Sequence, residues 1–103
     1  MRLPWGEGKS LTELGYTPRK VIVYRALPAK NPIIKKGDYL TDNFRFAKGH
    51  AQHMAVTEEE DQAVVSAYLP SDQVVGAPNP GEYRYSGNSD FHGAKVLVFI
   101  KSP

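Results

Sequence analysis

The chain has 103 residues, 41% of them hydrophobic, which predicts one domain with a modest core. The absence of cysteine excludes disulfides, thiolate catalysis and cysteine-bound zinc, and a net charge of +2 does not by itself indicate nucleic acid. No apolar run approaches the roughly 18 residues of a membrane span, and residues 1–10 lack the apolar centre of a secretion signal. We expect a cytoplasmic domain (host cytoplasm if the source is viral) without a membrane partner.

Residues 1–20 predict an irregular N-terminal leader, because glycines and prolines interrupt any regular pattern. Its larger apolar side chains, Trp5 among them, are expected to lie against the body of the domain. Residues 8–10 match the end of a phosphate-binding P-loop, but the earlier glycine and the preceding strand of that motif are missing. We therefore assign the leader no phosphate site.

Residues 21–25 form a β-branched and aromatic run that predicts a strand. The run is apolar on both faces, which favours a central position in a sheet. Alternation places Arg25 on the same face as Val21 and Val23, where its charge needs a partner. That partner is either a carboxylate in a structural ion pair or a bound phosphate or carboxylate ligand.

A loop bracketed by Pro28 and Pro32 leads to a short predicted strand at residues 39–41. The clearest helix is predicted over residues 43–55, with Thr41 or Asp42 as its N-cap. Its apolar side chains fall within one arc, as expected for a helix that packs on a core.

The pattern in the second half of the chain predicts three further strands and one turn of helix. Residues 62–69 and 82–86 alternate as strands do, and residues 71–75 are consistent with a single helical turn. Residues 94–101 are apolar on both faces and are expected to form a central strand. The order predicts an α+β fold with one main helix on a mixed, mainly antiparallel sheet of five to six strands.

Four segments carry a resemblance to a known family: VIVYRALP, GDYLTDNFRFAKGHA, VVSAYLPSDQVV and NPGEYRY. Together they resemble the ADP-ribosyltransferase-like domains of phage and bacterial proteins, over a core spanning residues 21–101. In those domains an arginine ends the first core strand, a hydroxyl or tyrosine ends the second, and a glutamate lies on a later strand. The resemblance implies NAD as the substrate and a macromolecule as the acceptor of ADP-ribose.

Carried onto this sequence, the resemblance implies one catalytic residue, Glu82, and three cofactor-binding residues. Arg25 would hold the NAD phosphates, Tyr39 would face the nicotinamide ring, and Thr41 would supply the hydroxyl. Apart from the resemblance, the aromatic side of residues 82–86 predicts that Tyr83 lies either in the core or in the cofactor-binding wall of the cleft. A carboxylate beside the ribose can stabilise the positive charge that develops when the nicotinamide bond breaks.

Two departures from the family pattern and two rival functions stay open. Residues 39–41 read Tyr-Leu-Thr, where many enzymes of this group carry a Ser-Thr-Ser-like stretch. Pro80 occupies the position two residues before Glu82, where enzymes that modify arginine carry an acidic or amide residue. The first rival is a catalytically inactive protein of the same fold that binds and inhibits a protein target. The second is a nucleic-acid binder that uses lysines and arginines of residues 35–48. Whether Arg25 and Glu82 face the same cleft distinguishes the ADP-ribosyltransferase from the inactive protein-binding relative.

A metal site is not expected. Two histidines, His50 and His53, are spaced to share one side of the predicted helix, but His92 is the only other histidine. Nothing in the proposed NAD chemistry requires a metal.

Overall fold

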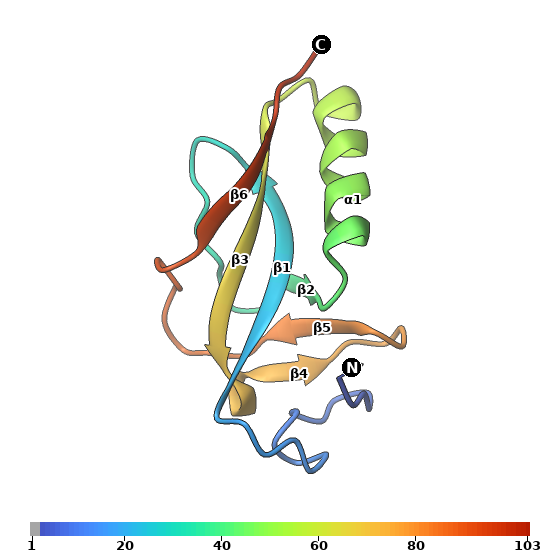
Figure 1. Cartoon of the computed structure of the whole chain (residues 1–103), viewed down its shortest axis with the longest axis vertical. Helices are drawn as coiled ribbons and strands as arrows, with labels where there is room; N and C mark the ends of the chain where they lie inside the picture. Colours follow the sequence, from blue (N-terminus) through green and yellow to red (C-terminus); the bar gives the residue numbers. More distant parts are fainter. Residues whose placement is uncertain (1–2) are drawn as a thin grey trace.

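The computed structural model describes residues 3–103 as a six-stranded antiparallel sheet with one helix packed on one face (Figure 1). The strands and helix are β1 Lys20–Pro28, β2 Tyr39–Thr41, α1 Phe44–Thr57, β3 Gln62–Pro70, β4 Val74–Gly76, β5 Glu82–Tyr85 and β6 Lys95–Ile100. A short 3-10 turn, η1 Ser71–Gln73, joins β3 to β4. The strand order is β4-β5-β2-β1-β3-β6, and all neighbouring strands are antiparallel. This confirms the predicted α+β class.

The two longest strands, β1 and β3, form the middle of the sheet (Figure 1). They pair without a break from Lys20 opposite Pro70 to Pro28 opposite Gln62. The predicted central position of β1 is therefore confirmed, because β2 and β3 flank it. Side chains alternate along β1, so it contributes to the packing on both faces of the sheet.

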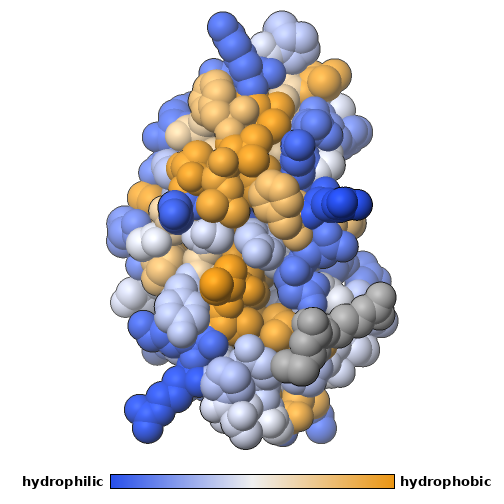
Figure 2. Space-filling view, viewed as in Figure 1, coloured by the Kyte–Doolittle hydropathy of each residue, from blue (hydrophilic) through white to orange (hydrophobic). Residues whose placement is uncertain are grey.

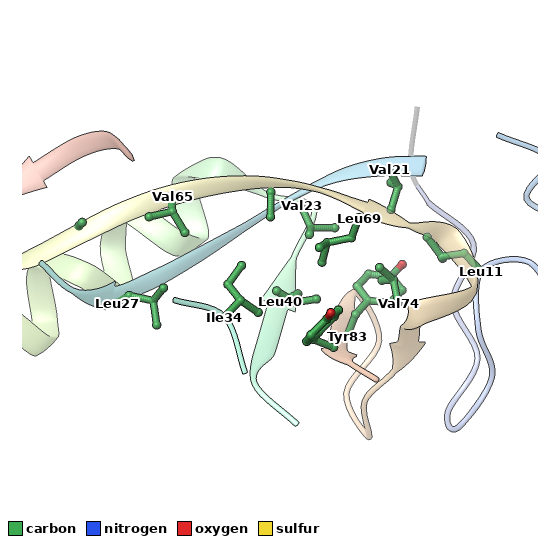
Figure 3. Packing of buried hydrophobic residues seen from close by; sticks show 13 residues of the cluster. Leu11, Val21, Val23, Leu27, Ile34, Leu40, Val65, Leu69, Val74 and Tyr83 are labelled. Atoms are coloured by element: carbon green, nitrogen blue, oxygen red, sulfur yellow. The ribbon is translucent and has the colours of Figure 1, made fainter. Parts of the chain in front are cut away.

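The larger core lies on the face opposite α1, where the leader and the long loops cover the sheet. Figure 3 shows side chains from every strand except β6 meeting there, with Leu11 of the leader beside them. Its largest fully buried members include Tyr83, Leu11, Ile34 and Leu69. At about 25 cal/mol per Å² of apolar area, this burial is the main term that holds the leader to the sheet.

The smaller core lies under α1. Ala47 and Ala51 pack on Val64, and Ala55 is also buried. The alanines recur every four residues, so they form one stripe along the helix and let it approach the sheet closely.

The helix begins one residue later than predicted. Asn43, and not Thr41 or Asp42, is the N-cap, because its side chain accepts a hydrogen bond of 3.1 Å from the N–H of Phe46. Thr41 still contributes, since its Oγ1 accepts from the N–H of Asn43 at 3.1 Å. The helix ends at Thr57, past the predicted end at residue 55.

The two edges of the sheet differ from the prediction. Residues 74 and 75 were expected in a helical turn, but they belong to β4, where they pair with β5. The leader in turn covers the outer side of β4, through hydrogen bonds from Gly8 N to Gly76 O (2.9 Å) and from Leu11 N to Val74 O (3.0 Å). The expectation that residues 94–101 form a central strand was wrong, because β6 is the last strand in the order.

Candidate functional site

Thr41 and Glu82 lie directly opposite each other in the β2–β5 ladder, and Thr41 also lies opposite Tyr24 of β1. Directly opposite residues share a face of the sheet. Tyr24 faces α1, where its ring meets that of Phe44 edge to face at a centroid distance of 5.7 Å. The three side chains therefore form a row across three strands on the helix side of the sheet.

Two adjoining hollows of about 1120 and 380 Å³ open over this row. Both are lined by the row itself, Tyr24, Thr41 and Glu82, together with Phe46 and Asn79. We call the combined depression the helix-side cleft. Its walls are aromatic and its floor carries a carboxylate and a hydroxyl, which is the mixture typical of small-molecule sites.

The larger hollow adds a cation and two further aromatic walls. Arg45, in the first turn of α1, and Trp5 of the leader both line it, as does Phe44. The indole N–H of Trp5 donates to the carbonyls of Ala77 and Glu82, each at 3.2 Å. The leader thereby fixes the backbone that presents the Glu82 side chain.

Thr41 is 7% exposed and accepts a hydrogen bond from the N–H of Asn43. A hydroxyl that accepts through a lone pair can still donate its own hydrogen. The predicted role of Thr41 at the helix start and its predicted place in a ligand site are therefore compatible.

Tyr39 lies on the same face, two residues before Thr41, and lines the smaller hollow. One face of its ring is occupied, since the guanidinium carbon of Arg84 lies 4.8 Å from the ring centroid. Arg84 also donates a 2.7 Å hydrogen bond to the Tyr39 hydroxyl. The predicted contact between Tyr39 and a nicotinamide ring is therefore restricted to the other face of the Tyr39 ring.

The side chains of Arg25 and Glu82 leave opposite faces of the sheet. Arg25 lies opposite Val65 in the β1–β3 ladder, on the face of the larger core, although it is also among the residues that line the smaller hollow with Glu82. Its Nε lies 3.4 Å from Oδ2 of Asp38, and a terminal guanidinium nitrogen donates to the Tyr39 carbonyl at 3.0 Å. Of the two partners expected for Arg25, the structure confirms the structural ion pair.

The electrostatics of Arg25 agree with a structural role. Burial lowers the pKa of its guanidinium, and the nearby Asp38 carboxylate raises it again in part. The Asp38 carboxylate and the Tyr39 carbonyl compensate this cation in part, although its buried Nε makes no hydrogen bond. The expected clamp on the NAD phosphates is therefore not formed by this side chain in the observed arrangement.

Tyr83 lies in the core and lines neither hollow, so its predicted place in the cofactor wall is corrected. Its neighbour Glu82 faces the helix side, and alternation turns Tyr83 to the other face (Figure 3). The Tyr83 hydroxyl donates to the carbonyl of Pro4 at 2.8 Å. Burial and the negative charge of Asp42 raise the pKa of Tyr83 to about 12.

The sequence prediction missed Trp5, Arg45 and Asn79 as cleft residues. The leader was expected to lie on the body, and its single tryptophan was the available signal. Where Trp5 meets the body of the domain depends on the pairing of the leader with β4, and no local sequence pattern predicts that pairing.

No family model, curated protein or solved structure matches this chain. Within residues 3–103, no three histidine, aspartate or glutamate side chains are grouped as metal ligands, and no helix has the length and apolar character to cross a bilayer. Functional inference consequently depends on the chemistry of the helix-side cleft.

Proposed function

We propose that the helix-side cleft binds NAD and that the protein is an ADP-ribosyltransferase-like enzyme acting on a macromolecular acceptor. The observation that carries this proposal is the direct cross-strand pairing of Thr41 and Glu82 at the floor of the cleft. These are the second-strand hydroxyl and the later-strand glutamate that the family resemblance assigns to the ribose.

Glu82 is the proposed catalytic residue. In the reaction the bond between nicotinamide and ribose breaks, and nicotinamide leaves with the bonding electrons. The carboxylate stabilises the positive charge that builds on the ribose. An acceptor nucleophile then forms the new bond to the ribose carbon and releases its proton to a base or to water.

Arg45 replaces Arg25 as the proposed partner of the pyrophosphate. It is exposed and lines the larger hollow beside the Tyr24–Thr41–Glu82 row. A guanidinium presents paired N–H donors that match phosphate oxygens. Phe44, Phe46 and Trp5 supply apolar walls for the rings of the ligand.

A second candidate is a catalytically inactive relative of the same fold that binds a protein target. The Arg25–Asp38 ion pair favours it, because an arginine engaged within the protein is not available to grip NAD. In that case the cleft or the exposed surfaces would recognise a protein.

The test is calorimetric titration with NAD at near-physiological salt, followed by an assay for nicotinamide release. Arg45→Ala should weaken binding by roughly tenfold or more, the expected loss of a charge-assisted hydrogen bond. Arg19→Ala is the matched control, because Arg19 is exposed and lines neither hollow. Glu82→Gln should keep NAD binding and lose nicotinamide release.

The outcomes separate the two candidates. Saturable binding with nicotinamide release that depends on Glu82 supports the enzyme. Binding without release in the wild type supports the inactive relative. The NAD proposal fails if the folded wild type binds no NAD at millimolar concentration.

A further inference from the structure

The two hollows of the helix-side cleft share one floor. Tyr24, Thr41 and Glu82 line both of them, and the larger measures about 1120 Å³ against about 380 Å³ for the smaller. Pockets that hold small ligands usually measure about 300–1,000 Å³, so the larger hollow has the size for a dinucleotide and the smaller for one group of a second reactant. A transfer reaction needs two such places beside one carboxylate.

The cations differ between the two hollows. Arg45 lines only the larger one and is exposed, so its guanidinium is available to phosphate oxygens. Arg25 lines only the smaller one, and it is already engaged by the Asp38 carboxylate and the Tyr39 carbonyl. The pyrophosphate of NAD therefore belongs in the larger hollow, which leaves the smaller one for the acceptor.

The smaller hollow also carries a group that can take up a proton. His50, in the second turn of α1, lines it together with Glu82 of β5, so the two side chains border the hollow from different elements. Among the residues that the structure describes, His50 is the only histidine that lines either hollow. Histidine is the commonest general base in enzymes, because its neutral ring accepts a proton near neutral pH.

We propose that the smaller hollow receives an O–H acceptor and that His50 is the general base for it. The proposal rests on the NAD-binding function proposed above and names the class of acceptor. The acceptor oxygen forms its bond to the ribose carbon, nicotinamide leaves with the electrons of the broken carbon–nitrogen bond, and the acceptor proton passes to an imidazole nitrogen of His50. His50 then returns this proton to water. The O–H group comes from water or from a hydroxyl of a macromolecule.

The charges around the smaller hollow favour a hydroxyl over a guanidinium as the acceptor. Arg25 already places one cation at this hollow, and of the described residues Glu82 is the one carboxylate that lines it. An arginine acceptor would add a second cation beside that single carboxylate. A hydroxyl enters without charge, and because it holds its proton at neutral pH it requires a base.

The smaller hollow can be reached from solvent. His50 is exposed and Tyr39 is 48% exposed, so an acceptor can enter between them while NAD fills the larger hollow. In this division Tyr39 borders the acceptor, and the apolar walls for the rings of NAD are those of the larger hollow. The hydrophobic area over β6 in Figure 2 contributes no residue to either hollow, so the entrance is separate from it.

The test is turnover of NAD in buffer that contains methanol as the simplest alcohol, with ADP-ribose and methyl ADP-ribose measured by mass spectrometry. His50→Gln should lower the formation of both products roughly 100-fold, as expected for the loss of a general base, and leave the affinity for NAD unchanged. His53→Gln is the matched control, because His53 is exposed on the same helix and lines neither hollow. Methyl ADP-ribose above the share of methanol in the solvent identifies an alcohol as the acceptor, and ADP-ribose alone identifies water.

The pH profile is a measurement that a purely structural role would not change. The wild-type rate should fall as the pH is lowered through the interval from 8 to 5 in which histidine ordinarily becomes charged, and His50→Gln should lack this fall. Besides His50, the titratable side chains at the smaller hollow are Tyr24, Arg25, Tyr39, which Arg84 contacts, and Glu82.

Three outcomes overturn the proposal. Equal rates in His50→Gln and His53→Gln overturn the role of His50 and leave NAD binding and the role of Glu82 intact. Faster turnover with agmatine, a soluble guanidine, than with methanol at the same concentration overturns the class of acceptor. A folded wild type that binds no NAD overturns the proposed function and this inference together.

Discussion

The guanidinium of Arg25 and the carboxylate of Asp38 form an ion pair that joins the middle of β1 to the residue preceding β2. Asp38 also accepts a 2.9 Å hydrogen bond from the N–H of Lys35, so the same carboxylate closes the turn before β2. Arg25 donates to the carbonyl of Tyr39, the first residue of β2. The ion pair therefore helps to position the strand that carries Thr41.

Replacing Asp38 should destabilise the fold. Asp38→Ala leaves a half-buried guanidinium without its anion and the Lys35 N–H without its acceptor, which should cost about 1–3 kcal/mol. Urea denaturation checks this, with Asp90→Ala in an exposed loop as the control. Equal midpoints for the two variants would contradict the structural role given to Arg25.

The raised pKa of Tyr83 predicts a loss of stability in alkaline solution. The folded protein keeps the phenol proton up to about pH 12, whereas an unfolded tyrosine loses it near its ordinary value of 10.0. Because the unfolded state releases its proton first, the contribution is complete below pH 10 and declines as the pH rises toward 12. Denaturation midpoints measured across this interval should fall.

Tyr83→Phe tests the assignment of that decline. The variant should lose about 0.5–1.5 kcal/mol at neutral pH, the usual worth of a hydrogen bond, here to the Pro4 carbonyl. It should also show a shallower alkaline decline than the wild type. Tyr68→Phe, at a tyrosine that is 58% exposed, controls for the loss of a hydroxyl at neutral pH.

Gly76 should be essential for docking of the leader. A Cβ at this position would lie 2.0 Å from the carbonyl oxygen of Gly6, so Gly76→Ala must displace the leader backbone. Hydrogen exchange should accelerate at the Gly8 and Leu11 amides, which bond to β4. Gly49→Ala, in the helix with open space around it, should instead stabilise the protein by up to about 1 kcal/mol. Unchanged exchange in Gly76→Ala would contradict the described contact.

Local patterns predicted the elements that depend on periodicity. The apolar run at β1 and the apolar arc of α1 each identified their element, because burial repeats with the geometry of strand or helix. Alternation also placed Arg25 on the face of Val21 and Val23. Alternation within one strand could not predict whether Glu82 and Arg25 point to the same face of the sheet. That depends on how β2 pairs with β1 and with β5.

The errors share one physical cause. Apolar side chains on both faces of β6 were interpreted as a sign of a central strand, but the sequence does not specify what lies beside it. Val74 and Val75 were placed in a helical turn because their pairing with β5 is a tertiary contact. Tyr83 was expected in the core or in the cleft wall, and which of the two it occupies depends on the face that β5 turns to the leader, a tertiary contact.

The leader has a consequence for assembly that reaches beyond its role in the cleft. It covers the outer side of β4, so that side is not free to pair with a strand of another chain. Removing residues 1–19 should uncover the outer side of β4 while that of β6 is already open, and a sheet with two open edges can extend by pairing into a ribbon. The irregular segment at the start of the chain would on this account act as a terminator that separates a finite particle from a fibre.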